Sequence, residues 1–120
     1  MVSVVKSKLL NQYQNFNGVI TRTANVYGSH QQLYRFVPKL ILSCLKGDKF
    51  YLDGNGSSSR SFIHINDVSE ALYKISNSKK KISSINISSK KIVSIKILAK
   101  IICKKLNCDP KKILVSKTDR

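Results

Sequence analysis

Apolar residues recur every three to four positions in four segments of the chain, and this spacing predicts amphipathic helices. Between these segments, short runs rich in valine, isoleucine and aromatic residues predict β-strands. Helices are predicted at residues 3–16, 36–45, 67–75 and 95–106, and strands at residues 19–23, 49–53, 61–65, 85–88 and 112–116. Because helices and strands alternate, the pattern predicts an α/β fold. No linker or repeat divides the sequence, which predicts a single domain, or part of one, over residues 1–120.

Capping signals predict where three of these helices begin or end. Gly47 is expected to end the helix at residues 36–45, because glycine adopts the left-handed conformation that stops helices. The run from Asp67 to Glu70 matches a capping box and predicts a helix start there. Ser94 is expected to cap the last helix, whose apolar face holds Ile95, Leu98, Ile101, Ile102 and Leu106.

The run at residues 61–65 alternates as a strand should. Phe62 and His64 are expected on one face, and Ile63 and Ile65 on the other. The run at residues 19–23 is short and apolar at its start, as a buried parallel strand would be.

Charge is the most unusual feature of the composition. The 120 residues include 22 lysines and arginines against 6 acidic residues, a net charge of +16. Such a balance attracts polyanions, including nucleic acid, anionic lipid and nucleotide diphosphates. Only four of the basic residues are arginines, the side chain that favours phosphate and base readout. A lysine excess mixed with asparagine, isoleucine and serine also fits a genome-wide compositional bias, so charge alone does not favour nucleic-acid binding.

The three cysteines, Cys44, Cys103 and Cys108, form no Cys-x-x-Cys pair. Their odd number favours reduced thiols in the cytoplasm. Cys44 and Cys103 fall within apolar helical patterns and are expected to be small core residues. No apolar run approaches the ~20 residues of a membrane span.

Two motifs carry the strongest functional signal. The first is Arg-Thr-Ala-Asn-Val-Tyr-Gly at residues 22–28. The second, at residues 54–68, contains Gly-x-Gly-x-x-x-Arg followed by Phe-Ile-His-Ile-x-Asp-Val. Together they resemble the substrate half of the extended short-chain dehydrogenase/reductase family, in particular its NAD-dependent nucleotide-sugar epimerases and dTDP-glucose 4,6-dehydratase-like members. The resemblance implies the C-terminal part of a Rossmann-type fold with a small substrate-binding lobe, the N-terminal NAD-binding part being absent.

The resemblance also implies which residues contact the substrate. Arg60 is expected to grip the diphosphate, which suits an arginine that can bond two oxygens at once. Asn25 is expected to reach the phosphate, and Arg35 and Phe36 to line the nucleotide pocket. Asn86 matches a family strand that ends in Asn-Ile-Gly. Without the resemblance, Arg60 reads as a surface arginine, Asn25 as a turn residue, Phe36 as helix core and Asn86 as structural.

The catalytic machinery of the resembled family is missing from this sequence. Its chemistry needs a tyrosine with a lysine four residues later, which helps the tyrosine to take a hydroxyl proton. The five tyrosines are followed at that spacing by Asn17, Gln31, Pro38, Asn55 and Asn77. No glycine triplet opens a helix after a strand, so the dinucleotide fingerprint is also missing. We therefore expect no catalytic residue, no metal site and no NAD bound by this chain alone, although the full-length family uses NAD.

The function predicted is that of part of an NAD-dependent nucleotide-sugar 4,6-dehydratase or epimerase, inactive alone and located in the cytoplasm. Its expected partner is a nucleotide sugar such as a dTDP-hexose, and the resembled enzymes are homodimers. Two alternatives stay open: a small basic nucleic-acid-binding domain, which would need arginines and aromatics on one face, and a pseudoenzyme that binds a nucleotide sugar without turnover. Neither nucleic acid nor a membrane is the expected partner.

Overall fold

The computed structural model describes residues 18–80 and 82–117. Helices and strands alternate along this part of the chain, which confirms the predicted α/β class. In chain order the elements are β1 (Ile20–Thr23), β2 (Asn25–Tyr27), α2 (Phe36–Lys46), β3 (Phe50–Asp53), the short 3₁₀ helix η1 (Gly54–Gly56), β4 (Ser59–His64), α3 (Ile65–Ser76), β5 (Ser84–Ile87), β6 (Ile92–Ser94), α4 (Ile95–Lys105), α5 (Pro110–Ile113) and β7 (Leu114–Lys117). The predicted helix at residues 3–16 lies outside the described residues.

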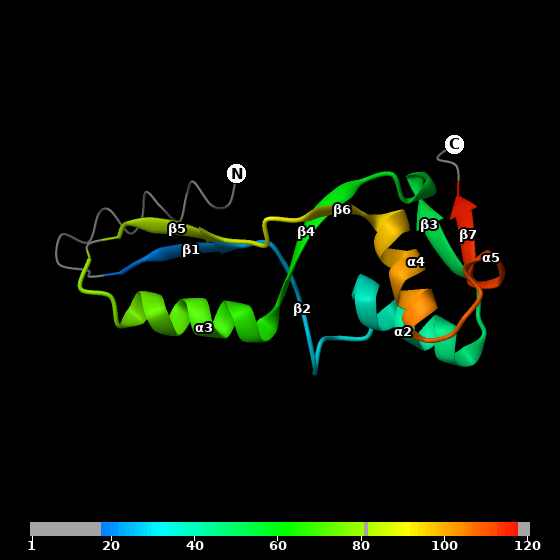
Figure 1. Cartoon of the computed structure of the whole chain (residues 1–120), viewed down its shortest axis with the longest axis horizontal. Coiled ribbons are helices and arrows are strands. Elements are labelled where there is room, and N and C mark those ends of the chain that lie inside the picture. Colours follow the sequence, from blue (N-terminus) through cyan, green and yellow to red (C-terminus); the bar gives the residue numbers. More distant parts are fainter. Residues whose placement is uncertain (1–17, 81, 118–120) are drawn as a thin grey trace.

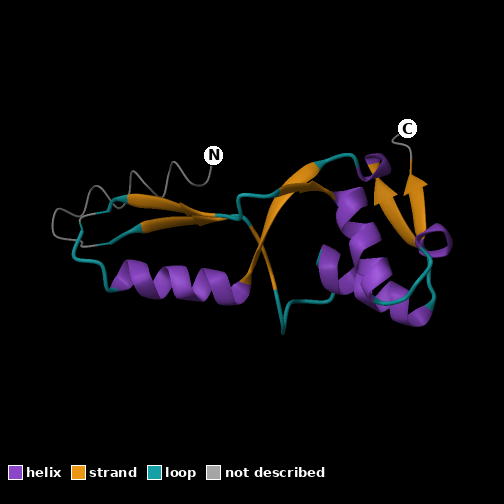
Figure 2. Ribbon diagram, in the orientation of Figure 1, coloured by secondary structure: helices purple, strands orange, loops and turns teal. Residues whose placement is uncertain are grey.

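The molecule consists of two lobes joined by a strand ribbon (Figure 1). One lobe contains β1 and β5, which pair in parallel, with α3 running alongside them. The other contains α2, α4 and α5 beside the parallel pair β3 and β7. The strand ribbon between the lobes is a three-stranded sheet in the order β2-β4-β6 (Figure 2). In it β2 is parallel and β6 antiparallel to β4. Separate lobes explain the elongated dimensions of 56 × 33 × 23 Å.

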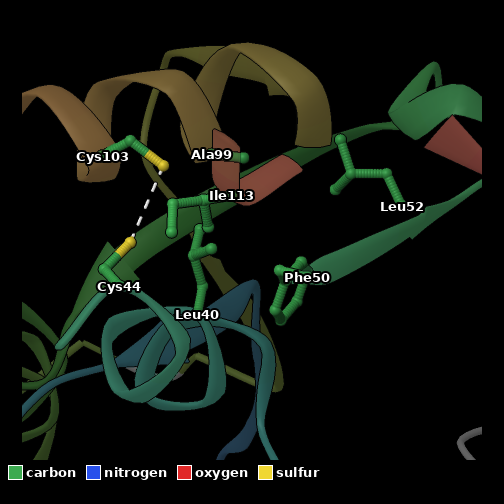
Figure 3. Packing of buried hydrophobic residues seen from close by; sticks show 7 residues of the cluster. All are labelled: Leu40, Cys44, Phe50, Leu52, Ala99, Cys103 and Ile113. Atoms are coloured by element: carbon green, nitrogen blue, oxygen red, sulfur yellow. Dashed lines mark hydrogen bonds between the residues drawn. The ribbon is translucent and has the colours of Figure 1, made fainter. Parts of the chain in front are cut away.

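Each lobe has its own hydrophobic core. The larger core joins α2 and α4 to β3, and its buried members are Leu40, Cys44, Phe50, Leu52, Ala99, Cys103 and Ile113 (Figure 3). The smaller core packs Val68 of α3 against Ile63 and Ile87 of the strands. The predicted core positions Cys44 and Cys103 are confirmed, since they are 5% and 0% exposed.

Several predicted boundaries are wrong for identifiable reasons. Helix α3 begins at Ile65, not at Asp67, because the Nδ1 atom of His64 accepts a hydrogen bond from the backbone N–H of Asn66 and caps the helix. Glu70 therefore makes no capping box, and its carboxylate instead pairs with Lys74 one turn later. Ile65, predicted as the last residue of the strand at residues 61–65, is instead the first residue of α3 and is 37% exposed.

Other differences concern burial and short elements. Ile101, expected on the buried face of α4, is 48% exposed, and Ala99 and Cys103 take the core positions instead. Strand β1 is parallel as predicted, but none of its residues is buried. The three-residue strands β2 and β6 and the short helix α5 were not predicted from the sequence.

Candidate functional site

A cleft of about 920 Å³ lies beside the strand ribbon and reaches the larger core. Its walls come from β2 and the loop after it, the start of α2, β3, and the start of β4. Arg35, Lys39 and Arg60 line it, against Asp53 as its acidic residue. The cleft therefore has an excess of positive charge, which favours an anionic ligand.

Arg60 lies near the start of β4, directly after the glycine-serine turn. Its side chain is exposed and donates a hydrogen bond to the carbonyl of the adjacent Ser59, 3.0 Å away. That contact uses only one of the five guanidinium N–H groups. Among the described residues Arg60 has no acidic partner within ion-pair distance, so the remaining donors are available to a ligand in the cleft.

Asn25 opens β2 and lies opposite Phe62 of β4 in the parallel ladder. Its side-chain amide donates to the carbonyl of Ser61 at 3.2 Å. This bond holds Asn25 beside the strand that carries Arg60. The amide has a second N–H, and its carbonyl oxygen is also available.

Arg35 and Phe36 are placed by the first turn of α2. Arg35 is the N-cap residue, but no side chain caps this helix and its first turn contains no acid. The N-terminal N–H groups and the helix dipole there favour negative charge. The Arg35 guanidinium lies 5.4 Å from the centre of the Tyr34 ring, over its face. Phe36 packs edge-on against Phe50 at 5.6 Å, so it serves both the core and the cleft wall.

The structure thus brings Asn25, Arg35, Phe36 and Arg60 to one cleft. Asn86 is not among them, because it lies on β5 opposite Arg22, with its side chain exposed in the other lobe. Its predicted substrate contact stays a prediction without support from this geometry.

The cleft also contains residues that the sequence patterns did not single out. Gln31 donates from Nε2 to the carbonyl of Val26 at 2.9 Å, while its buried Oε1 has no partner among the described residues. Lys39 lies 6.0 Å from the ring centre of Phe50. Lys39 follows Arg35 by one helical turn, and that spacing is the signal that would have placed both on the cleft side.

Binding is what this arrangement supports chemically. Arginine, lysine and amide side chains line one cleft, but no tyrosine in the chain has a lysine four residues later. Among residues 18–80 and 82–117 there is also no group of histidine, cysteine and acidic side chains that could hold a metal ion. The described part of the chain has no helix long and apolar enough to cross a membrane.

Comparison with known proteins identifies the family. The model of the NAD dependent epimerase/dehydratase family matches residues 6–88, more than half of the chain. The chain belongs to this family. A trifunctional UDP-glucose 4,6-dehydratase/UDP-4-keto-6-deoxy-D-glucose 3,5-epimerase/UDP-4-keto-L-rhamnose-reductase of Arabidopsis thaliana is 36% identical over 92 residues, which is 77% of this chain and 14% of that protein. Human dTDP-D-glucose 4,6-dehydratase is 39% identical over 64 residues, 53% of this chain and 18% of the enzyme.

Solved structures show the same fold. A dTDP-glucose 4,6-dehydratase from Bacillus anthracis, determined in complex with NAD, superposes with a TM-score of 0.85 at 22% identity and matches 98% of this chain. A UDP-glucose 4-epimerase from Thermotoga maritima, determined with UDP-glucose, gives a TM-score of 0.86 at 23% identity. The chain covers 37% and 39% of these two proteins. The predicted family and Rossmann-type fold are confirmed, and the chain spans less than two fifths of the length of these relatives.

Proposed function

We propose that this chain forms part of the nucleotide-sugar pocket of an NAD-dependent 4,6-dehydratase or epimerase. In this proposal Arg60 binds the diphosphate, Asn25 contacts a phosphate oxygen, and Arg35 and Phe36 border the nucleotide. The observation that carries the proposal is the meeting of these four side chains in one positively charged cleft, although they come from three separate elements. Membership of the family supports the same assignment.

The charge and geometry of the cleft suit a diphosphate. The Arg60 guanidinium and the N-terminus of α2, with Arg35 beside it, both border the cleft, and each favours a phosphate group. Phe36 and Phe50 add an apolar surface beside these donors, as nucleotide sites require. NAD supplies hydride transfer in enzymes of this kind, but the described residues show neither a glycine-rich cradle for a dinucleotide nor a paired tyrosine and lysine. We propose that the chain alone binds the sugar nucleotide and does not turn it over.

Turnover is tested by incubating the purified chain with NAD and dTDP-glucose and measuring the 4-keto-6-deoxy product. We expect no product above a blank without protein, because no tyrosine in the sequence has a lysine four residues later to help it take the sugar hydroxyl proton. Product formation that depends on the chain would contradict this part of the proposal.

Binding is tested by titrating dTDP-glucose against Arg60→Gln and, as a matched control, Arg22→Gln. Each variant loses one exposed arginine, but Arg22 lies on β1 and outside the cleft. Arg60→Gln should lower the affinity about ten- to hundredfold, the value of a charge-assisted hydrogen bond of roughly 1.5–3 kcal/mol. Arg22→Gln should leave the affinity unchanged.

Two results would overturn the binding proposal. One is an equal loss in both variants, which would show diffuse attraction by net charge. The other is tight binding of a short DNA duplex that weakens when Lys79 and Lys80 become glutamine, without measurable binding of dTDP-glucose. DNA binding without dTDP-glucose binding would favour the basic nucleic-acid-binding alternative. The affinity for DNA should then fall steeply with salt.

A further inference from the structure

The larger core contains a pair of thiols that the proposed function does not use. The Sγ atoms of Cys44 and Cys103 lie 3.7 Å apart, although the residues are 59 positions apart in the sequence. Figure 3 shows the two side chains pointing toward each other, Cys44 from α2 and Cys103 from α4. We propose that Cys44 and Cys103 are a disulfide-forming site that joins α2 to α4 under oxidising conditions.

The geometry favours this pair over the other combinations. A disulfide has an S–S bond of about 2.05 Å, so the two sulfurs must approach by less than one atomic diameter. Both helices are held together by the surrounding core residues, Leu40, Ala99 and Ile113. The third cysteine is engaged differently, because Cys108 directs its thiol to the backbone carbonyl of Cys44 at 3.5 Å. Cys108 is also in the loop after α4 and is only partly buried.

The proposed bridge would join the same two helices, α2 and α4, whose first residues line the cleft. Phe36 and Ile95 line the cleft at the starts of α2 and α4. Cys44 and Cys103 each follow these residues by eight positions, about 12 Å along a helix. A bridge there would fix the two helices behind the cleft wall.

The reaction balances with a two-electron oxidant such as diamide, whose N=N group accepts the electrons. Two S–H bonds break and one S–S bond forms. The two electrons and two protons pass to the diazene, which becomes the corresponding hydrazine. Burial and the neighbouring thiols raise the pKa of Cys44 to about 12, so this thiol is protonated at neutral pH and its oxidation will be slow. Incubation for hours at mildly alkaline pH is appropriate.

The test uses the full 120-residue chain, reduced and then treated with diamide in native buffer. After oxidation, free thiols are alkylated with N-ethylmaleimide in denaturant. We expect one adduct instead of three. After trypsin digestion without reduction, the peptide of residues 40–46 should be linked to that of residues 101–104. Reduction before alkylation should restore three adducts.

Oxidation of the chain in guanidinium chloride provides the matched comparison. In the unfolded chain, Cys103 and Cys108 should pair preferentially, because closing a short loop costs the least entropy. Native oxidation that yields the same Cys103–Cys108 link, a Cys44–Cys108 link, or three free thiols would overturn the proposal.

Two serine variants distinguish a specific Cys44–Cys103 bridge from general oxidation of the thiols. Cys108→Ser should still form the bridge and leave no free thiol after oxidation. Cys103→Ser should leave both remaining thiols free. A Cys108→Ser chain that keeps two alkylatable cysteines after prolonged oxidation would contradict the assignment.

Discussion

At the scale of single residues, Gly28 lies where the structure leaves no room for a side chain. A Cβ atom built on it would stand 2.4 Å from Cγ2 and 3.1 Å from Cβ of Ile65, the first residue of α3. The glycine therefore permits the chain leaving β2 to pass close to the start of α3. This approach sets the path of the loop that carries Gln31 and Arg35 into the cleft.

We predict that Gly28→Ala lowers the free energy of unfolding by about 1–3 kcal/mol, the usual cost of overpacking. Thermal or urea unfolding of the chain measures this loss. Adding Ile65→Ala should recover part of it, because the closest clashing atom is removed. Ser29→Ala, at the exposed next position, is the control and should change stability little. Equal stability of Gly28→Ala and Ser29→Ala would contradict the close approach.

The Cys44 thiol predicts a pH dependence of stability. Burial, together with Cys103 and Cys108, raises the pKa of Cys44 from 9.0 to about 12. The folded chain thus holds this proton more tightly than the unfolded chain does. The protonated Cys44 thiol therefore contributes fully to the free energy of unfolding below pH 9. This contribution is lost as the pH rises from 9 to 12, by up to about 1.4 kcal/mol per pH unit. Unfolding curves of the reduced chain and of Cys44→Ala over this range measure the effect, and the variant should show the shallower decline.

At the scale of elements, the start of α2 combines a weak cap with a binding position. Arg35 occupies the N-cap position, where aspartate, serine and asparagine stabilise helices best, and its side chain makes no capping bond. We predict that Arg35→Asp raises stability by about 1 kcal/mol while it lowers the affinity for dTDP-glucose, because it reverses a charge at the cleft. Unfolding of this variant measures the gain in stability, and titration with dTDP-glucose measures the loss of affinity. If the variant is no more stable, the weak cap at Arg35 is contradicted. If it binds dTDP-glucose equally well, the binding role of Arg35 is contradicted.

Local signals in the sequence predicted most elements but misplaced their ends. Gly47 ends α2 as predicted, with a φ angle of 72°, because that stop depends on the residue's own conformational freedom. The start of α3 was misread because a histidine caps it, which is uncommon. The sequence did contain a signal for α5, since the Asp109 carboxylate caps a helix that begins with Pro110.

At the scale of the whole molecule, long-range pairing explains what local patterns missed. Strands β2 and β6 have three residues each and owe their form to β4, which lies between them. Their pairing also decides which residues share the cleft, so it brings Asn25 beside the strand of Arg60 and leaves Asn86 in the other lobe. Four of the five residues that the family resemblance implies for the substrate site line one cleft, but separation into two lobes is a tertiary property that the motifs do not contain.

Two small cores in an extended molecule distinguish the chain from a compact domain. Its radius of gyration is 18.3 Å, against about 14 Å for a compact domain of 120 residues. The cleft lies mainly against the larger core, to which Phe36, Phe50 and Leu52 belong. We therefore expect a nucleotide sugar to affect this lobe, the strand ribbon and Ile65 at the start of α3. The rest of α3, with β1 and β5, should stay unchanged.

An NMR titration of the ¹⁵N-labelled chain with dTDP-glucose tests that central claim most directly. The backbone and side-chain amide signals of Asn25, and the backbone signals of Arg35, Phe36 and Arg60, should shift together and saturate. The signals of Asn86 and of α3 beyond its first turn should not move, because only Ile65 at the start of α3 lines the cleft. Shifts concentrated at Asn86 and along β1 and β5, or spread evenly over the lysine-rich surface, would contradict the assignment of the nucleotide-sugar site to this cleft.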